Sequence, residues 1–365
     1  MTSRKLNLRI PGPTPLPPQV LKSMSLPMIN HRGKDYEEMQ KRIIKNLQYF
    51  FGTENDIYLL TSSGMGGLES AIVNFFSTGE KVLFLTCGEF GNRWAEIGKR
   101  YNLEVLHEKV IPGKGLETIE VENILGKNKN INAVFITLNE TSSGVLNNVA
   151  QLSKIIHQHP NNPLILVDGI SALGAVDLPM DELGIDVLVT ASQKAWMAAP
   201  GLAMISASQK AWNKYPKSDL PKYYFDLKMY SEFNIKNQTP ATPGVSTLFG
   251  LDMALGMMRQ EGKEKIFKKH LMMRDYLREK IRGLGLELYV EEKYASPTVT
   301  SIKLPDGVDG HKWLQILREK YNTILAGGMG ETKGKIIRVA HMGYVSKKDL
   351  DDVINALKKS LQDLK

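Results

Sequence analysis

The stretch Val187-Leu188-Val189-Thr190-Ala191-Ser192-Gln193-Lys194-Ala195-Trp196 is a β-branched run that passes into small polar residues, one lysine and an aromatic residue. The apolar run predicts a buried strand, with Lys194 just beyond its end. Partial burial beside Trp196 would lower the pKa of the amine, and a neutral amine is what Schiff-base chemistry with a carbonyl requires. A lone lysine after a strand is more often a solvated turn residue, so this stretch alone leaves both interpretations open.

A carboxylate follows the preceding apolar run. Leu164-Ile165-Leu166-Val167 predicts a second buried strand, and it ends in Asp168-Gly169. Ligands of open α/β sheets bind at this edge. Alone, Asp168 would be a helix cap or a turn residue. Together, an aspartate for a pyridinium nitrogen and a lysine for an aldehyde meet the two demands of pyridoxal phosphate (PLP). The pair therefore predicts Asp168 and Lys194 as catalytic residues of a PLP site.

The residues around the lysine resemble those of a known family. Ser192-Gln193-Lys194-Ala195 followed by Pro200-Gly201 resembles the class V PLP-dependent aminotransferases, and within them the alanine–glyoxylate and serine–pyruvate enzymes. The resemblance runs from Pro11 to about Gly343. It implies PLP fold type I, an α/β large domain with a mostly parallel seven-stranded sheet and a smaller C-terminal α+β domain. It also places Gln193 among the cofactor-binding residues.

The alternation of strands and helices from residue 56 to about 205 independently predicts a mostly parallel sheet with helices on both faces. We expect an N-terminal arm at 1–20, a large PLP-binding domain at 21–250 and a small domain at 251–365. Further expected elements are a helix from Asp35, its cap, to Phe51; an irregular loop at 222–246; one or two helices at 249–282; helices at 311–321 and 346–364; and strands at 57–61, 81–86, 133–138, 287–290, 298–304 and 336–339.

A Gly/Ser-rich turn, Thr61–Gly67, lies between a predicted strand and a predicted helix. Free backbone N–H groups at a helix start bind a phosphate, although many strand-to-helix turns are glycine-rich. In the resembled family this turn holds the PLP phosphate, which implies Ser63, Gly64 and Met65 as contacts. The family often has histidine where Met65 stands, so this contact is expected through the backbone.

Three further cofactor contacts are implied by the resemblance. Phe90 corresponds to the aromatic residue that stacks on the pyridine ring, although it could equally be a core residue. Thr141 and Ser142, in Asn139-Glu140-Thr141-Ser142-Ser143-Gly144, stand where hydroxyls contact the coenzyme or the substrate. Capping of the next helix is the alternative for both hydroxyls.

The loop Asn237–Pro243 holds two prolines and two threonines. In the resembled family this loop reaches into the neighbouring subunit and donates a hydroxyl to the phosphate, so Thr242 and then Thr239 are expected cofactor contacts. The family often has tyrosine at the position of Thr239. The resemblance thus implies a homodimer with shared active sites.

The expected substrate-binding residues are Arg338, Gly12 and Arg32. Arg338 stands in an apolar strand, where a buried guanidinium needs an anion; a protein carboxylate is the alternative to a substrate carboxylate. The family places its substrate-carboxylate arginine in this strand and its Pro-Gly-Pro segment, here Pro11–Pro13, at the mouth of the site. Arg32 could instead be a surface turn residue.

Composition narrows the functional class. The chain has 365 residues, 42% hydrophobic, with a formal net charge of +8 but no arginine-rich arm, so nucleic acid is not an expected partner. No apolar run is long enough for a membrane span, no apolar signal segment follows Met1, and Cys87 is the single cysteine. We therefore expect a cytoplasmic enzyme without a metal site. The lack of a Gly-x-Gly-x-x-Gly turn after the first strand disfavours a nicotinamide dehydrogenase.

The predicted function is a ping-pong transaminase that moves the amino group of alanine or serine to glyoxylate or pyruvate. A phosphonate or phosphoserine aminotransferase is the first alternative. A PLP-dependent lyase such as a cysteine desulfurase would need a reactive thiol on a mobile loop, whereas Cys87 directly follows a strand. A non-catalytic protein on an enzyme fold is the third alternative.

Overall fold

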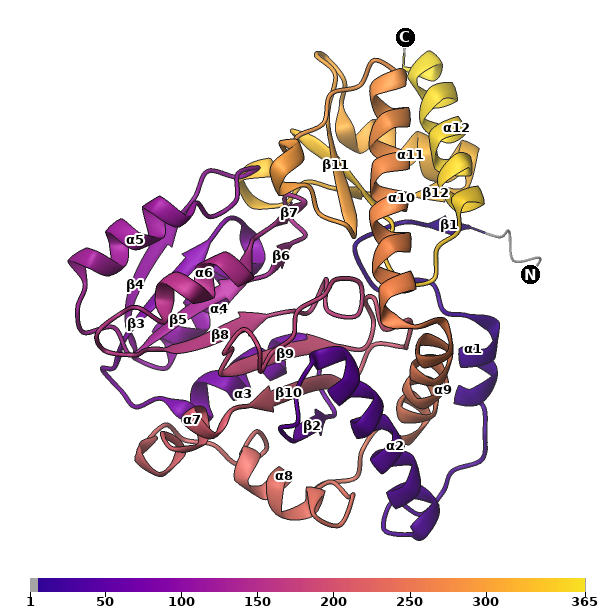
Figure 1. The fold of residues 1–365 in the computed structure, drawn as a ribbon. Coiled ribbons are helices and arrows are strands. Elements are labelled where there is room, and N and C mark those ends of the chain that lie inside the picture. Colours follow the sequence, from indigo (N-terminus) through magenta and orange to yellow (C-terminus); the bar gives the residue numbers. More distant parts are fainter. Residues whose placement is uncertain (1–5, 365) are drawn as a thin grey trace.

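The computed structural model describes residues 6–364 and has a large and a small part (Figure 1). The large part is built on a seven-stranded sheet. Its strand order is β2 (Ile57–Leu60), β10 (Ala203–Ala207), β9 (Val187–Ala191), β8 (Leu164–Asp168), β5 (Ala133–Thr137), β3 (Lys81–Thr86) and β4 (Glu104–Lys109). β10 runs antiparallel to β2 and β9, and the other neighbouring strands pair in parallel, so the sheet is mixed but mostly parallel, as expected.

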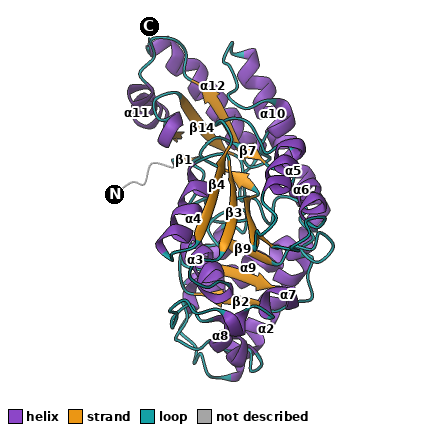
Figure 2. Cartoon of the chain, turned by 90° about the vertical axis from the view of Figure 1, so that its left-hand side faces the viewer, coloured by secondary structure: helices purple, strands orange, loops and turns teal. Residues whose placement is uncertain are grey.

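Helices cover both faces of this sheet (Figure 2). Along β8, Leu164 and Leu166 join the core on one face, whereas Ile165 and Val167 join the core on the other. Because both faces are buried, the strand is a continuous apolar run rather than an alternating one. The helices are α1 (Pro18–Met24), α2 (Lys34–Phe51), α3 (Gly64–Phe75), α4 (Glu89–Arg100), α5 (Thr118–Lys127), α6 (Val149–Ile156), α7 (Gln209–Trp212), α8 (Leu227–Asn234) and α9 (Val245–Glu261).

The small part packs helices on an antiparallel sheet of order β11 (Val299–Lys303), β14 (Ile336–Ala340) and β13 (Ala326–Gly327). Its helices are α10 (Lys263–Gly283), α11 (Gly310–Tyr321) and α12 (Lys347–Asp363). Short elements complete the chain: the hairpin β6 (Asn139–Glu140) and β7 (Val145–Leu146), the strand β12 (Thr323–Ile324), and 3-10 turns at Tyr215–Lys217, Glu292–Tyr294 and Gly330–Thr332.

The N-terminal segment joins the two parts. The strand β1 (Asn7–Leu8) pairs in parallel with β12. The carbonyl of Arg9 then accepts from Ala340 N at 2.8 Å, and Thr14 N donates to the carbonyl of Gln193 at 3.1 Å. Residues 7–14 therefore run from the small sheet to the segment that follows β9.

Three local expectations are wrong. The helix α2 begins at Lys34 after Gly33, so Asp35 lies in its first turn and is not the cap. Residues 287–290 form no strand; Leu288 makes only an isolated bridge to Ile302. Part of 222–246 is helical, because the side chain of Asp226 accepts from Lys228 N and caps α8.

The stretch 249–282, expected as one or two helices, forms two, α9 and α10, which are separated by Gly262, where φ is +86°. None of the helices in residues 6–364 is both long and apolar enough to span a bilayer.

The aromatic core over one face of the sheet should dominate stability. Phe135 is 1% exposed, stacks on Phe84 at 4.0 Å between ring centroids, and meets Trp94 edge-on at 4.9 Å. We expect Phe135→Ala to lower the free energy of unfolding by about 3–5 kcal/mol, because the ring leaves a cavity. Urea unfolding followed by tryptophan fluorescence measures this. Ile119→Ala, at a side chain 61% exposed, is the control; equal losses for the two variants would contradict the expectation.

Candidate active site

Lys194 and Asp168 meet in one cavity because they follow neighbouring parallel strands, β9 and β8. The cavity has a volume of ≈ 200 Å³ and opens at the carboxyl edge of the large sheet. It is lined by Ser63, Gly64, Met65, Leu68, Phe90, Asn139, Thr141, Asp168, Ile170, Ser171, Gln193 and Lys194. Eight of the sequence-predicted site residues are thus brought together: Ser63, Gly64, Met65, Phe90, Thr141, Asp168, Gln193 and Lys194.

Asp168 is only 4% exposed. Desolvation raises the pKa of its carboxyl to about 7, although a hydrogen bond from Ile170 N at 2.9 Å acts in the opposite direction. The nearby charge of Glu140 raises the pKa further, and Lys194 lowers it. The carboxyl is therefore poised to share a proton with a ligand near neutral pH.

Burial lowers the pKa of the Lys194 amine to about 8, against the attraction of Asp168. Its Nζ donates to the carbonyl of Pro11. Gly12 lies so close that an added Cβ would stand 2.5 Å from Nζ, and its φ is +124°. Only glycine fits there, so the Gly12 segment forms a wall against the lysine.

The start of α3 presents backbone donors to the cavity. Ser63 precedes the helix without a side-chain cap, and in residues 6–364 no protein group accepts from the N–H of Gly64 or Met65. Such a helix start attracts an anion. An added Cβ on Gly64 would stand 2.7 Å from Ile170 Cδ1, so helix and sheet edge are in tight contact.

Arg338, on β14, is 5% exposed. Its Nε donates to Gly327 O at 2.8 Å and its Nη1 to Thr141 O at 2.7 Å. No carboxylate in the described part of the chain forms an ion pair with it, so the alternative of a protein partner is not realised. Burial lowers its pKa to about 10, with Glu140 acting the other way. The unused N–H groups of the fork remain available for an external carboxylate.

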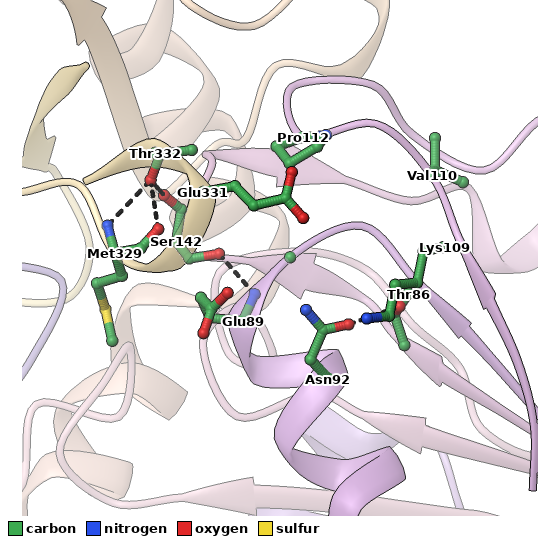
Figure 3. A pocket seen from close by; sticks show the side chains of 11 residues that line it. Thr86, Glu89, Asn92, Lys109, Val110, Pro112, Ser142, Met329, Glu331 and Thr332 are labelled. Carbon is green, nitrogen blue, oxygen red and sulfur yellow. Dashed lines mark hydrogen bonds between the residues drawn. The ribbon is translucent and has the colours of Figure 1, made fainter. Parts of the chain in front are cut away.

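The hydroxyl of Ser142 does not line the Lys194 cavity. It donates to Glu140 Oε1 at 2.7 Å and accepts from Glu89 N at 3.0 Å. Ser142 lines a separate, smaller cavity of ≈ 20 Å³ between the start of α4 and the 329–332 turn (Figure 3). Of the two residues expected to contact the coenzyme or the substrate, only Thr141 lines the Lys194 cavity.

Glu140 is wholly buried and was not singled out from the sequence. Its Oε2 accepts from Phe90 N at 3.0 Å and Gly91 N at 3.1 Å, and its Oε1 accepts from Ser142 N at 2.9 Å. With the Ser142 hydroxyl, these donors fix both the first turn of α4, which carries Phe90, and the turn at Thr141. An acidic residue inside an otherwise uncharged turn is the only signal that the sequence offers.

Arg32, Thr239 and Thr242 lie away from this cavity. Arg32 donates from Nη2 to Pro240 O at 3.1 Å and from Nη1 to Gln238 Oε1 at 3.3 Å. The Thr239 hydroxyl donates to Ala241 O at 2.8 Å, and Thr242 is exposed. In the single chain, Arg32 therefore holds the 238–240 loop.

Asn139 and Ser171 are cavity residues that sequence reasoning missed. Asn139 lies two residues beyond the end of β5, so the rule that ligands bind at the carboxyl ends of strands would have indicated it. The amide oxygens of Asn139 and Gln193 are buried without a partner in the described residues. Buried acceptors of this kind normally have a donor, so a ligand with N–H or O–H groups fits the cavity.

Comparison with known proteins agrees with this geometry. The crystal structure of an alanine–glyoxylate aminotransferase from Nostoc sp. matches with a TM-score of 0.94 and 28% identity, over 99% of this chain and 96% of that one. The fold is thus the fold-type-I aminotransferase fold. Residues 7–353 match the aminotransferase class-V family, and the chain belongs to this family.

Three relatives cover the chain almost end to end. The soluble hydrogenase 42 kDa subunit of Anabaena cylindrica is 37% identical over 99% of this chain and 94% of its own length. The serine–glyoxylate aminotransferase of Methylorubrum extorquens is 32% identical, over 98% and 91%. The L-aspartate–glyoxylate aminotransferase of Paracoccus denitrificans is also 32% identical, over 92% and 86%. Within residues 6–364, no group of three or more His, Cys, Asp or Glu side chains is placed to hold a metal ion.

The raised pKa of Asp168 has a consequence for stability. The folded state holds this proton up to a pKa of about 7, whereas the unfolded chain releases it near 3.8. The stability of the ligand-free protein therefore falls as the pH rises through this window, by up to about 1.4 kcal/mol per pH unit. We expect Asp168→Asn to be more stable than wild type at pH 8, with a gain that shrinks toward pH 5.

Urea midpoints at pH 5, 6, 7 and 8 measure this difference. Asp177→Asn, at an exposed carboxylate, is the matched control and should leave the pH dependence unchanged. A gain for Asp168→Asn that is equal at all four pH values would contradict the burial argument.

Proposed function

We propose that the protein is a PLP-dependent transaminase that moves the amino group of a small L-amino acid, alanine or serine, to glyoxylate or pyruvate by a ping-pong mechanism. One observation carries the proposal. An amine with a lowered pKa, Lys194, and a buried carboxyl, Asp168, share a cavity with the uncapped start of α3.

The residues of the cavity fit PLP. The α3 start at Ser63, Gly64 and Met65 suits the phosphate, and Asp168 suits the pyridine nitrogen. Phe90 and Ile170 supply apolar surface for the ring, and the unpartnered amides of Asn139 and Gln193 suit polar substituents. When bound, PLP supplies a carbonyl carbon for amines and a ring that accepts electrons.

The chain's own groups account for the remaining steps. Arg338 orients the substrate carboxylate through the N–H groups that protein carbonyls leave free. Nζ of Lys194, with a pKa of about 8, would take the proton from the substrate Cα as a general base and deliver it, as a general acid, to the carbon that the cofactor supplies. Asp168 holds the proton at the ring nitrogen. The Pro11–Gly12 wall shields the lysine from water on one side.

The relatives support glyoxylate as the acceptor more strongly than they support any one donor. The aminotransferases compared above share glyoxylate in their names but differ in alanine, serine or aspartate. A phosphoserine-type donor would need a second cation. Arg32, the candidate, is already engaged by the 238–240 loop, so nothing favours that alternative.

The burial and the raised thiol pKa of Cys87 disfavour the alternative of a PLP-dependent lyase. Cys87 is fully buried, accepts from Asn147 Nδ2 at 3.3 Å, and has its thiol pKa raised by desolvation to about 12. A thiol in this state is neither ionised near neutral pH nor accessible to substrate.

We expect the purified protein with bound PLP to react with alanine and serine, seen as a change in visible absorbance when single L-amino acids are added. Reaction with aspartate, glutamate or phosphoserine alone would contradict the proposed donor. Lys194→Ala should lower turnover by at least ~10²–10⁴-fold, because proton transfer is lost. Lys222→Ala, at a half-buried lysine that bonds Ser218 and Leu220, is the control.

The proposal includes a homodimer in which the 237–243 loop completes the partner's site. Thr242 is exposed at the end of this loop, and Arg32 and Gln40 tie the loop to α2 and the turn before it. A phosphate needs several donors to replace its water, and the α3 start alone supplies few. An exposed hydroxyl on an anchored loop fits this need.

We expect Thr242→Val to weaken PLP binding by about 1–3 kcal/mol, because a hydroxyl that serves a charged acceptor is lost. Thr242→Ser should restore the affinity. PLP titration of the apo-protein by fluorescence, beside light scattering for mass, measures both. Wild-type affinity in the valine variant, or a monomer that holds PLP and turns over, would contradict the shared site.

A further inference from the structure

Asn139 lines the cavity, and the nitrogen of its side-chain amide has hydrogen-bond partners for both of its hydrogens. It is 3% exposed, and its Nδ2 donates to Ser171 Oγ at 2.8 Å and to Thr298 Oγ1 at 3.1 Å. Both amide hydrogens are thereby used. Its Oδ1 is buried and has no partner in residues 6–364. The unused hydrogen-bonding capacity of Asn139, which lines the cavity, is therefore that of an acceptor.

The directions of the neighbouring hydrogens fix this orientation. Ser171 Oγ gives its own hydrogen to Asn139 O at 2.7 Å, and Thr298 Oγ1 gives its hydrogen to Ser171 O at 3.1 Å. Ser296 Oγ already accepts from Thr298 N and Val299 N, so it donates to Thr298 Oγ1 at 3.1 Å. Both hydroxyls present only lone pairs to Asn139, which suits Nδ2 and would leave a flipped Oδ1 without a donor.

Thr298 belongs to the small part, whereas Asn139 and Ser171 belong to the large one. It immediately precedes β11 and is fully buried. Its carbonyl accepts from His341 N at 2.9 Å, directly after the strand that carries Arg338. One threonine thus connects the end of β14, the strand that carries Arg338, to the amide of Asn139.

We propose that Thr298 is a positioning residue that orients Asn139 so that Oδ1 accepts a hydrogen bond from an N–H or O–H of the bound cofactor or substrate. This inference rests on the proposed function. Thr298 does not line the cavity itself. It acts, together with Ser171, by engaging Nδ2, which leaves Oδ1 as the free acceptor of this cavity-lining residue.

The test compares Thr298→Val, which keeps the shape and removes the hydroxyl, with Thr298→Ser, which keeps the hydroxyl. PLP titration of the full-length apo-protein reports the cofactor side, and KM and kcat for alanine report the substrate side. We expect the valine variant to lose about three- to tenfold in PLP affinity, or to gain as much in KM if the donor is on the substrate. The serine variant should stay within about twofold of wild type.

Thr300→Val is the matched control. Thr300 is also buried and lies on the same strand, but its hydroxyl meets His341 Nε2 at 2.9 Å and not the cavity wall. It should lose stability without losing PLP affinity. Equal binding losses at Thr300 and Thr298, an impaired serine variant, or a folded valine variant with wild-type PLP affinity and KM would each overturn the inference.

The test also distinguishes a variant that does not fold from a wild-type protein that does not bind PLP. Should Thr298→Val fail to fold by circular dichroism, Thr298→Ala removes the same hydroxyl without a methyl group that could clash, and it is judged by the same criteria. A wild-type protein that binds no PLP would overturn the proposed function and this inference together. A wild type that binds PLP beside an unaffected variant would overturn the role of Thr298 alone.

Discussion

Desolvation of charge at the carboxyl edge of the large sheet is the constraint on which the site depends. Asp168 and Lys194 are both removed from water, and burial shifts their pKa values toward each other, to about 7 and about 8. An isolated carboxylate or ammonium would be very costly there. The buried strands on either side, covered on both faces by helices, make the edge dry enough for these shifts.

Backbone groups supply much of the compensation. Glu140 relies on peptide N–H groups and one hydroxyl, Arg338 on two carbonyls, and Lys194 on the carbonyl of Pro11. No direct ion pair holds any of these three groups in the described chain. The charges are therefore fixed in place without being neutralised by contact, which leaves them responsive to a charged ligand.

The positions of the site residues could be predicted from the sequence wherever they follow from the residues next to them in the chain. Lys194 and Asp168 were predictable because Asp168 directly ends one apolar run, Lys194 stands a few residues beyond the next, and strand ends meet at one edge. The side-chain direction of Ser142 was not, since it depends on Glu140 and on the start of α4. The pairing of Asn139 with Thr298 joins residues far apart in the chain, and no local pattern announces it. The antiparallel direction of β10 was likewise not readable from its apolar run.

The pairing of β1 with β12 sets the order in which this protein is completed during synthesis. Asn7 waits for Thr323, which is made after every strand of the seven-stranded sheet. Until then residues 9–14 lack their anchor on the small sheet, and the segment that carries Pro11 and Gly12 is held only at Thr14, which bonds the carbonyls of Gln193 and Lys194. A nascent chain with a finished seven-stranded sheet would thus have the wall beside Lys194 fixed at one end only, until the small sheet forms and binds the other end.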